Sequence, residues 1–167
     1  MSSRPHRAPA TSSVRLERLG LDRARALIAG DMTVVNAAPG WPHADSLDGI
    51  ALEAEHADSD EATCFLVIST HSGQVVGEAG WKGGPDADGV AEIGYGLAAP
   101  SRGRGLGSEL VNQLTAWVLA QPDVALVVAY VLPGNVASRR ALERNGFELD
   151  EHAPSTPGDE LRYVRRR

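Results

Sequence analysis

The chain has 167 residues, of which 43% are hydrophobic, and it carries a formal net charge of −6. This length accommodates one well-filled core but not two ordinary domains, and the acidic balance argues against general nucleic-acid binding, which favours a basic face. Cys64 is the single cysteine, so an internal disulfide is excluded and a reducing, cytoplasmic location is expected. No apolar run of about 18 residues predicts a membrane span, and the five scattered histidines form no zinc-ligand cluster, so we expect no membrane and no metal.

The beginning of the chain differs in composition from the rest. Residues 1–13 are rich in Ser, Pro, Ala and Arg without an apolar period, which predicts a disordered tail. Residues 14–167 are expected to form a single domain, whose elements follow from apolar periodicity and chain-breaking residues. In chain order we expect a strand at 14–19, helices near 22–30 and 45–56, strands at 62–69, 75–81 and 90–97, a helix near 105–120, a strand at 124–132, a helix from 135 to 146, a strand from 147 and a last strand at 161–164.

Capping residues and apolar spacing support the first two helices. Asp22 is the expected cap of the first helix, and Asp45 or Ser46 that of the second. Leu47 and Ile50 give the second helix an apolar face at helical spacing. The whole order of elements describes an α/β (α+β) protein with a mixed sheet and helices on both faces.

Three glycines connect the strand at 90–97 to the helix that follows it. Gly103, Gly105 and Gly107 alternate with other residues, and glycine lets a ligand approach the main chain closely. The first turn of a helix has N–H groups without an intrahelical partner and the positive end of the dipole, so the turn predicts an anion site, most simply for phosphate. Arg102 and Arg104 would add charged donors at its rim. The alternative is a tight connection between strand and helix with no ligand.

Two common phosphate motifs are absent from this turn. It has no Gly-Lys-Ser/Thr, which excludes a Walker loop, and Ser108 and Leu110 stand where a dinucleotide fingerprint would have its third glycine. A nucleotide-binding domain of another fold is therefore a weak alternative.

The spacing Arg102-x-x-Gly105-x-Gly107 resembles the acyl-CoA pyrophosphate loop of the GNAT superfamily of N-acyltransferases. The preceding segment 91–97 is similar to the fourth strand of that family, and the segment 135–147 is similar to its Asn-x-x-Ser…Gly-Phe region. The version found here is closest to the branch that contains the RimJ/RimL-type ribosomal-protein acetyltransferases. The resemblance covers residues 90–147 and is weaker on either side.

This resemblance implies a mostly antiparallel sheet of about seven strands, whose fourth and fifth strands splay apart around acetyl-CoA as co-substrate. Pantetheine would lie beside the strand that ends at Leu97, and the pyrophosphate would lie on main-chain N–H groups of the turn. A homodimer is common in the family. The expected acetyl-CoA-binding residues are Leu97, Arg102, Gly103, Arg104, Gly105, Leu106, Gly107, Ser108 and Asn135.

Acyl transfer to an amine needs a base for the amine and a donor for the departing thiolate. Glu92 is the candidate base because it is the only carboxylate within the strand 90–97, where it shares a face with Gly94 and Gly96; alternatively, it faces solvent or pairs with an arginine. Many family members place a tyrosine four residues after Ser138, but Leu142 stands there and cannot donate. Ser138 is the candidate thiolate donor, or otherwise a helix-start serine that bonds the backbone.

Three aromatic residues are candidates for the acceptor pocket. Trp41, Trp81 and Tyr95 are amphipathic, although packing is an alternative role for each, and His43 is a weaker candidate base. The expected function is transfer of an acetyl group from acetyl-CoA to a primary amine, either a protein N-terminus or a small molecule. A non-catalytic acyl-CoA-binding module or sensor is the alternative, because the usual tyrosine is missing.

Overall fold

A computed structural model describes residues 12–55, 64–154, 156 and 158–167. Most of the tail predicted at 1–13 lies outside these residues. The predicted order of strands and helices is confirmed. The elements of the described chain are β1 (Val14–Arg18), α1 (Leu21–Ile28), η1 (Met32–Val34), α2 (Ala44–Glu55), β2 (Cys64–Ser69), β3 (Val75–Trp81), β4 (Val90–Leu97), η2 (Ala99–Ser101), α3 (Leu106–Leu119), β5 (Leu126–Val131), α4 (Val136–Arg144), β6 (Glu148–Leu149) and β7 (Leu161–Arg166).

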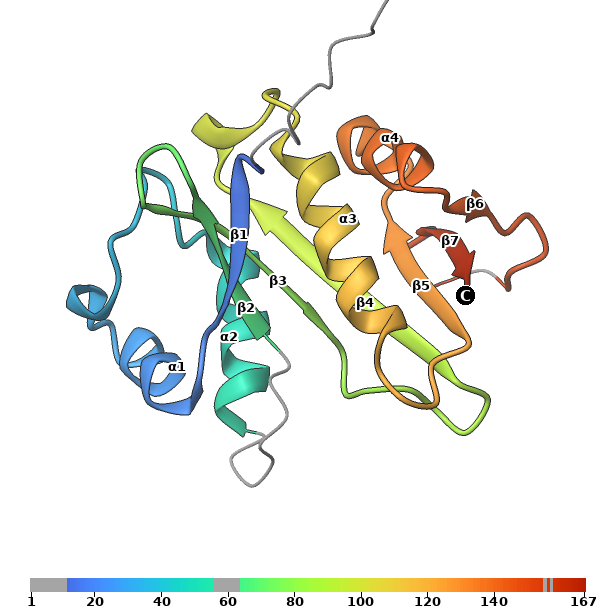
Figure 1. Ribbon diagram of the computed structural model, residues 1–167, viewed down its shortest axis with the longest axis horizontal. Coiled ribbons are helices and arrows are strands. Elements are labelled where there is room, and N and C mark those ends of the chain that lie inside the picture. Colours follow the sequence, from blue (N-terminus) through green and yellow to red (C-terminus); the bar gives the residue numbers. More distant parts are fainter. Residues whose placement is uncertain (1–11, 56–63, 155, 157) are drawn as a thin grey trace, which may run out of the picture.

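The described strands form one seven-stranded sheet in the order β1-β2-β3-β4-β5-β7-β6. Neighbouring strands are antiparallel except β4 and β5, which run parallel. A parallel pair needs a crossover between its strands, and α3 is that crossover (Figure 1). The expected mixed, mostly antiparallel sheet is therefore confirmed.

Helices cover both faces of the sheet, and each face has its own apolar core. Phe65 and Val67 of β2 point toward α3, whereas Leu66 and Ile68 point toward α1 and α2. Because side chains alternate along a strand, a strand covered on both faces reads as a continuous apolar run. This explains why the sequence of β2 shows no polar alternation.

The starts of α1 and α2 differ from the sequence expectation. α1 begins after Gly20, and Asp22 lies within its first turn instead of capping it. α2 begins at Ala44, so neither Asp45 nor Ser46 precedes it as a cap. Leu47 is 40% exposed, so it lies outside the buried face of the helix.

The cap of α2 is supplied by His43. The ring nitrogen Nδ1 of His43 accepts the N–H of Ser46, and the hydroxyl of Ser46 accepts the N–H of His43, both at 3.2 Å. This reciprocal pattern is that of a capping box, with an imidazole in place of the usual Ser or Thr at the first position. A cap of this kind fixes the orientation of the His43 ring.

The first described residues are bonded to α3. Ser12 and Ser13, at the end of the predicted tail, both hydrogen-bond to Glu109 of α3.

In the described part of the chain, no helix has the length and apolar character needed to cross a membrane.

Candidate functional site

β4 and β5 separate part-way along their length. They pair over only three residues of each strand, from Val90 opposite Leu126 to Glu92 opposite Val128. β4 continues to Leu97, and beyond Glu92 its only partner among the described strands is β3. The edge of β4 that faces β5 therefore has main-chain groups without a strand partner over residues 93–97. Figure 1 shows the two strands adjacent at one end and far apart at the other, which confirms the expected splay.

The glycine turn that follows β4 exposes main-chain N–H groups at the start of α3. Gly103 and Gly105 have φ angles of 75° and 80°, a left-handed region that side-chain-bearing residues rarely adopt. No side chain caps α3, and the N–H groups of residues 103–107 donate to no acceptor within the described chain. Nothing lies within 4 Å of where a Cβ would be at Gly103 or Gly105. The loop therefore presents several unbonded N–H donors beside open space, as an anion site requires.

The residues around this loop have distinct partners. Arg102 donates from Nε to the carbonyl of Leu97 at 2.9 Å, which ties the loop back to the end of β4. Arg104 is exposed. Asn145, just after α4, donates to both the carbonyl and the hydroxyl of Ser108, at 2.9 and 3.2 Å. The starts of the loop and of α3 are thus held in place by neighbouring elements.

The start of α4 lies next to the side chain of Tyr95 on β4. Asn135 caps the helix by accepting the N–H of Ser138 at 3.1 Å. The hydroxyl of Tyr95, on β4, donates to the carbonyl of Ser138 at 3.4 Å. Burial raises the pKa of Tyr95 to about 12, so this hydroxyl stays protonated at neutral pH. Leu142 is fully buried in the core, where it occupies the position of the family's usual tyrosine.

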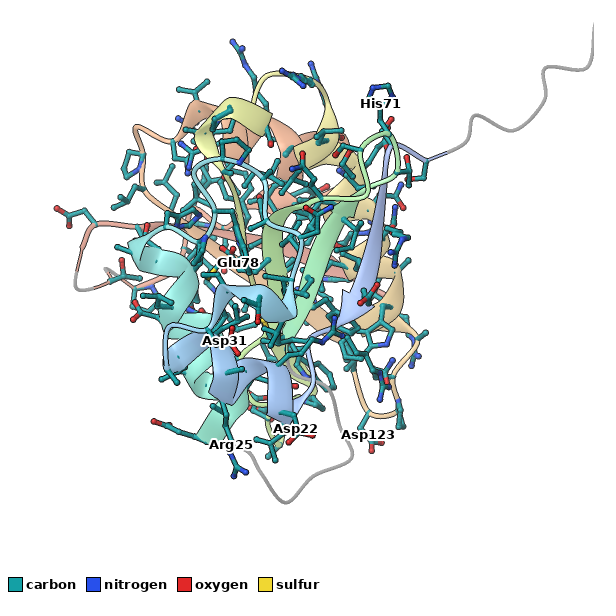
Figure 2. All side chains as sticks on the ribbon, turned by 90° about the vertical axis from the view of Figure 1, so that its left-hand side faces the viewer. Asp22, Arg25, Asp31, His71, Glu78 and Asp123 are labelled. Atoms are coloured by element: carbon teal, nitrogen blue, oxygen red, sulfur yellow. The ribbon has the colours of Figure 1, made fainter. Side chains whose placement is uncertain are left out.

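On the other face of β4, a buried carboxylate lies against the main chain. Glu78 of β3 is 7% exposed and lies directly opposite Gly96 in the strand register. A Cβ at Gly96 would lie 2.4 Å from Oε1 of Glu78 and 3.0 Å from Nε2 of His43. The indole N–H of Trp41 donates to Oε2 of Glu78 at 2.6 Å. Figure 2 shows Glu78 at the middle of the face covered by α1 and α2, whereas the labelled Asp22 lies at its margin.

The electrostatics of Glu78 follow from this position. Burial raises its pKa, because a charged carboxylate loses water there. Hydrogen bonds from Ser46 and Trp41 and the proximity of His43 act in the opposite direction, and Asp45 adds to the rise. The result is a carboxylate that is held in place and that binds a proton more readily than an exposed glutamate.

Glu92, the base predicted from the sequence, has a different environment. Its carboxylate pairs with the ammonium group of Lys82 at 2.5 Å, and both side chains are partly exposed. This contact corresponds to the alternative of a charge pair, with a lysine in place of the arginine. Lys82 also covers Gly94, where a Cβ would lie 3.8 Å from its Cε.

Trp81 and Trp41, predicted together as acceptor-site residues, lie on opposite faces of the sheet. Trp81 is buried in the core under α3, with its ring centroid 5.1 Å from that of Trp117 in an edge-to-face arrangement. Trp41 is buried on the face of α1 and α2. Tyr95 hydrogen-bonds the start of α4, whereas Trp41 hydrogen-bonds Glu78.

Glu78 was not among the sequence candidates. The signal available was a single charged residue inside the apolar strand 75–81, flanked by glycines at 77 and 80. Such a residue is buried only when a partner satisfies it. Its partners Trp41 and Gly96 are 37 and 18 positions away in the chain, so only the strand register and the cap of α2 reveal the cluster.

The described residues contain no group of three or more His, Cys, Asp or Glu side chains that could hold a metal ion. Cys64 is buried, and burial together with the carboxylates of Glu53 and Glu78 raises its pKa to about 12. It is therefore a neutral thiol at physiological pH and not an activated nucleophile.

Comparisons with known proteins agree with this geometry. The family model described as "Acetyltransferase (GNAT) domain" matches residues 14–148. The uncharacterized N-acetyltransferase YjdG of Bacillus subtilis (strain 168) is 27% identical over 114 residues, which cover 66% of this chain and 68% of that protein.

Two solved structures show the same fold. The aminoglycoside acetyltransferase AAC(6')-Ib in complex with coenzyme A has a TM-score of 0.63 at 23% identity, covering 93% of this chain and 95% of that one. A proposed ribosomal-protein-serine acetyltransferase from Vibrio cholerae has a TM-score of 0.67 at 18% identity, covering 95% of this chain and 96% of that one.

Proposed function

The chain belongs to the acetyltransferase (GNAT) family, and we propose that it transfers the acetyl group of acetyl-CoA to a primary amine. The observation that carries this proposal is the row of N–H groups at 103–107 that have no acceptor in the described part of the chain, next to the edge of β4 that β5 leaves open. An anion site beside an unpaired strand edge fits a ligand with a diphosphate at one end and amide groups at the other. Acetyl-CoA has both, and it supplies the acetyl group already activated as a thioester.

Each part of this region then has a role toward acetyl-CoA. The N–H groups of residues 103–107 would hold the pyrophosphate, with Arg104 adding charge at the rim. The edge of β4 up to Leu97 would bond the amide groups of pantetheine. Arg102 and Asn135 keep the loop and the start of α4 in position through the contacts described above.

A hydroxyl beside the departing sulfur would stabilise the thiolate by a hydrogen bond. Ser138 is the candidate from the sequence, and Tyr95 lies next to it, bonded to its carbonyl. Their adjacency supports catalysis in a chain that lacks the usual tyrosine at Leu142. Transfer directly to the amine, without an acyl-enzyme, agrees with the inert state of the buried Cys64.

Two classes of acceptor follow from the relatives. The name of the aminoglycoside acetyltransferase gives a small-molecule acceptor, and that of the proposed ribosomal-protein-serine acetyltransferase gives a protein acceptor. We propose that the acceptor is a primary amine, either of a small molecule or of a protein N-terminus. We further propose that the enzyme is cytoplasmic, and the homodimer stays a prediction. The alternative, a non-catalytic acyl-CoA sensor, rests on the leucine at position 142.

Release of free thiol from acetyl-CoA tests the proposal. The purified protein is incubated with acetyl-CoA and a panel of polyamines, amino acids, aminoglycosides and N-terminal peptides. We expect amine-dependent thiol release with at least one class, together with coenzyme A binding in calorimetry. Binding without release across the panel would favour the sensor, and absence of both would refute the assignment to acetyl-CoA.

A further inference from the structure

The cluster of Glu78, His43 and Trp41 has features that packing alone does not explain. Glu78 is a buried carboxylate in an otherwise apolar strand, bonded by the indole of Trp41. Nε2 of His43 is buried without a hydrogen-bond partner in the described chain and points at Oε1 of Glu78 from 3.6 Å. That separation is too long for a direct hydrogen bond, so both groups retain bonding capacity.

The cap of α2 determines which proton His43 presents. The N–H of Ser46 donates to Nδ1, so in the neutral ring Nδ1 is the acceptor and Nε2 carries the hydrogen. The Nε2–H of His43 is therefore directed toward Glu78 without bonding it, whereas the hydroxyl of Ser46 and the indole of Trp41 hydrogen-bond the carboxylate. Two donors around one carboxylate define the position of its charge.

This carboxylate lies beside the part of β4 that has left β5. Gly96 is four residues beyond Glu92, the last residue of β4 that pairs with β5. Because Gly96 has no side chain, Glu78 and His43 approach its main chain at distances that no other residue would permit. Only the backbone of β4 separates Glu78 from the strand edge that would bond pantetheine.

On these observations we infer that Glu78 binds the ammonium group of the acceptor and takes its proton, with Trp41 and His43 as positioning residues. This inference rests on the proposed acetyl transfer and deepens it: the acceptor is a cation before reaction. An alkylammonium is mostly protonated at pH 7, so the reaction needs such a base. Glu92 is already paired with Lys82, whereas among the described residues no lysine or arginine pairs with Glu78, and its neighbour His43 is a cation only when protonated.

The proposed step is balanced in protons and electrons. One ammonium proton moves to the carboxylate of Glu78, and the freed lone pair of nitrogen forms the C–N bond to the acetyl carbon. The C–S bond breaks, and its electron pair stays on sulfur. A second nitrogen proton goes to that sulfur, so the products are an amide, a thiol and a protonated Glu78 that returns its proton to solvent.

The pH dependence follows from the groups around Glu78. His43 precedes α2, Asp45 lies in its first turn and Cys64 lies on β2, and each interacts electrostatically with Glu78. The base must be ionised, so kcat should fall on the acid side as pH drops through the raised pKa of Glu78. Removal of the Trp41 donor should raise that pKa further and move the acid limb to higher pH.

Glu78→Gln tests the inference, with Glu53→Gln as matched control. Glu53 is also 7% exposed, but it lies on α2 and accepts the N–H of Cys64 on β2. We expect Glu78→Gln to lower kcat by about 100-fold or more, the range for loss of a general base, and to lose the acid limb. Glu53→Gln should keep the wild-type kcat, and both variants should bind coenzyme A with wild-type affinity in calorimetry.

Trp41→Phe and nitrogen NMR supply two further readouts. Trp41→Phe should shift the acid limb of kcat upward, and ¹⁵N shifts of His43 should show the Nε2–H form and change in Glu78→Gln. A Glu78→Gln enzyme with wild-type kcat and pH profile would overturn the inference and leave acetyl transfer intact. An unshifted acid limb in Trp41→Phe would also overturn it, and a wild-type protein without amine-dependent turnover would end both proposals.

Discussion

Replacing Gly96 by alanine tests how closely Glu78 and His43 approach β4. The added Cβ would lie 2.4 Å from Oε1 of Glu78 and 3.0 Å from Nε2 of His43, so at least one side chain must move by about 1 Å. Oε2 of Glu78 is held by Trp41, and His43 is fixed by the cap of α2, so neither moves without cost. Overpacking of this kind destabilises a protein by about 1–3 kcal/mol.

Gly94→Ala is the matched control on the same strand and face. Its Cβ would meet only Cε of Lys82, at an ordinary contact distance of 3.8 Å. Lower backbone entropy of the unfolded chain should make this variant about 0.4–1 kcal/mol more stable. Urea unfolding at pH 7 measures both, and equal stability of the two variants would refute the reasoning.

Three further predictions concern the loop, the start of α4 and the thiol. Gly105→Val should weaken coenzyme A binding at least 10-fold in calorimetry without unfolding the protein. Gly73→Val, at φ 69° in the β2–β3 turn, has similar strain but should bind normally. Asn135→Ala should lower the free energy of unfolding in urea by about 1 kcal/mol, because the cap is lost. Asn135→Asp should keep most of the wild-type stability, because its carboxylate can still accept the N–H of Ser138. Cys64, whose pKa is raised to about 12, should stay protonated at pH 8 and react with a thiol reagent only after unfolding, whereas labelling at the rate of a free thiol would contradict its burial.

Much of the fold was predictable because its signals are local. The glycine turn, the apolar run of β2 and the caps and breakers around α3 and α4 each lie within a short segment of the chain. The start of α2 was not predictable in this way, since Asp45 and Ser46 are the usual capping types. The cap is the ring of His43, a residue type that capping statistics do not favour.

The candidate site also has one part that the sequence could predict and one part that it could not. The acetyl-CoA side consists of consecutive main-chain groups at 103–107, which a sequence pattern can specify. The acceptor side consists of single side chains from separate elements, Trp41 and His43 before α2 and Glu78 on β3. Alternation along β4 pointed to Glu92 and gave its face correctly, but it could not show that Lys82 neutralises Glu92.

The register between β3 and β4 explains why Glu78 is unusual for a core residue. It aligns Gly80 with Gly94 and Glu78 with Gly96, so three of these four positions have no side chain and the fourth is a carboxylate. A buried apolar side chain at any of these four positions would stabilise the fold by about 1.5–3 kcal/mol. The residues found at these positions are therefore not the ones that maximise stability. Burial of Glu78 also costs stability at neutral pH, because it raises the pKa of this carboxyl in the folded state. The stabilising effect of the raised pKa is fully present only below the ordinary pKa of glutamate, and it is lost as pH rises through the pKa of the folded state. A chain that retains an ionisable group under these conditions, beside a strand edge left open by β5, is consistent with selection of that group for proton transfer.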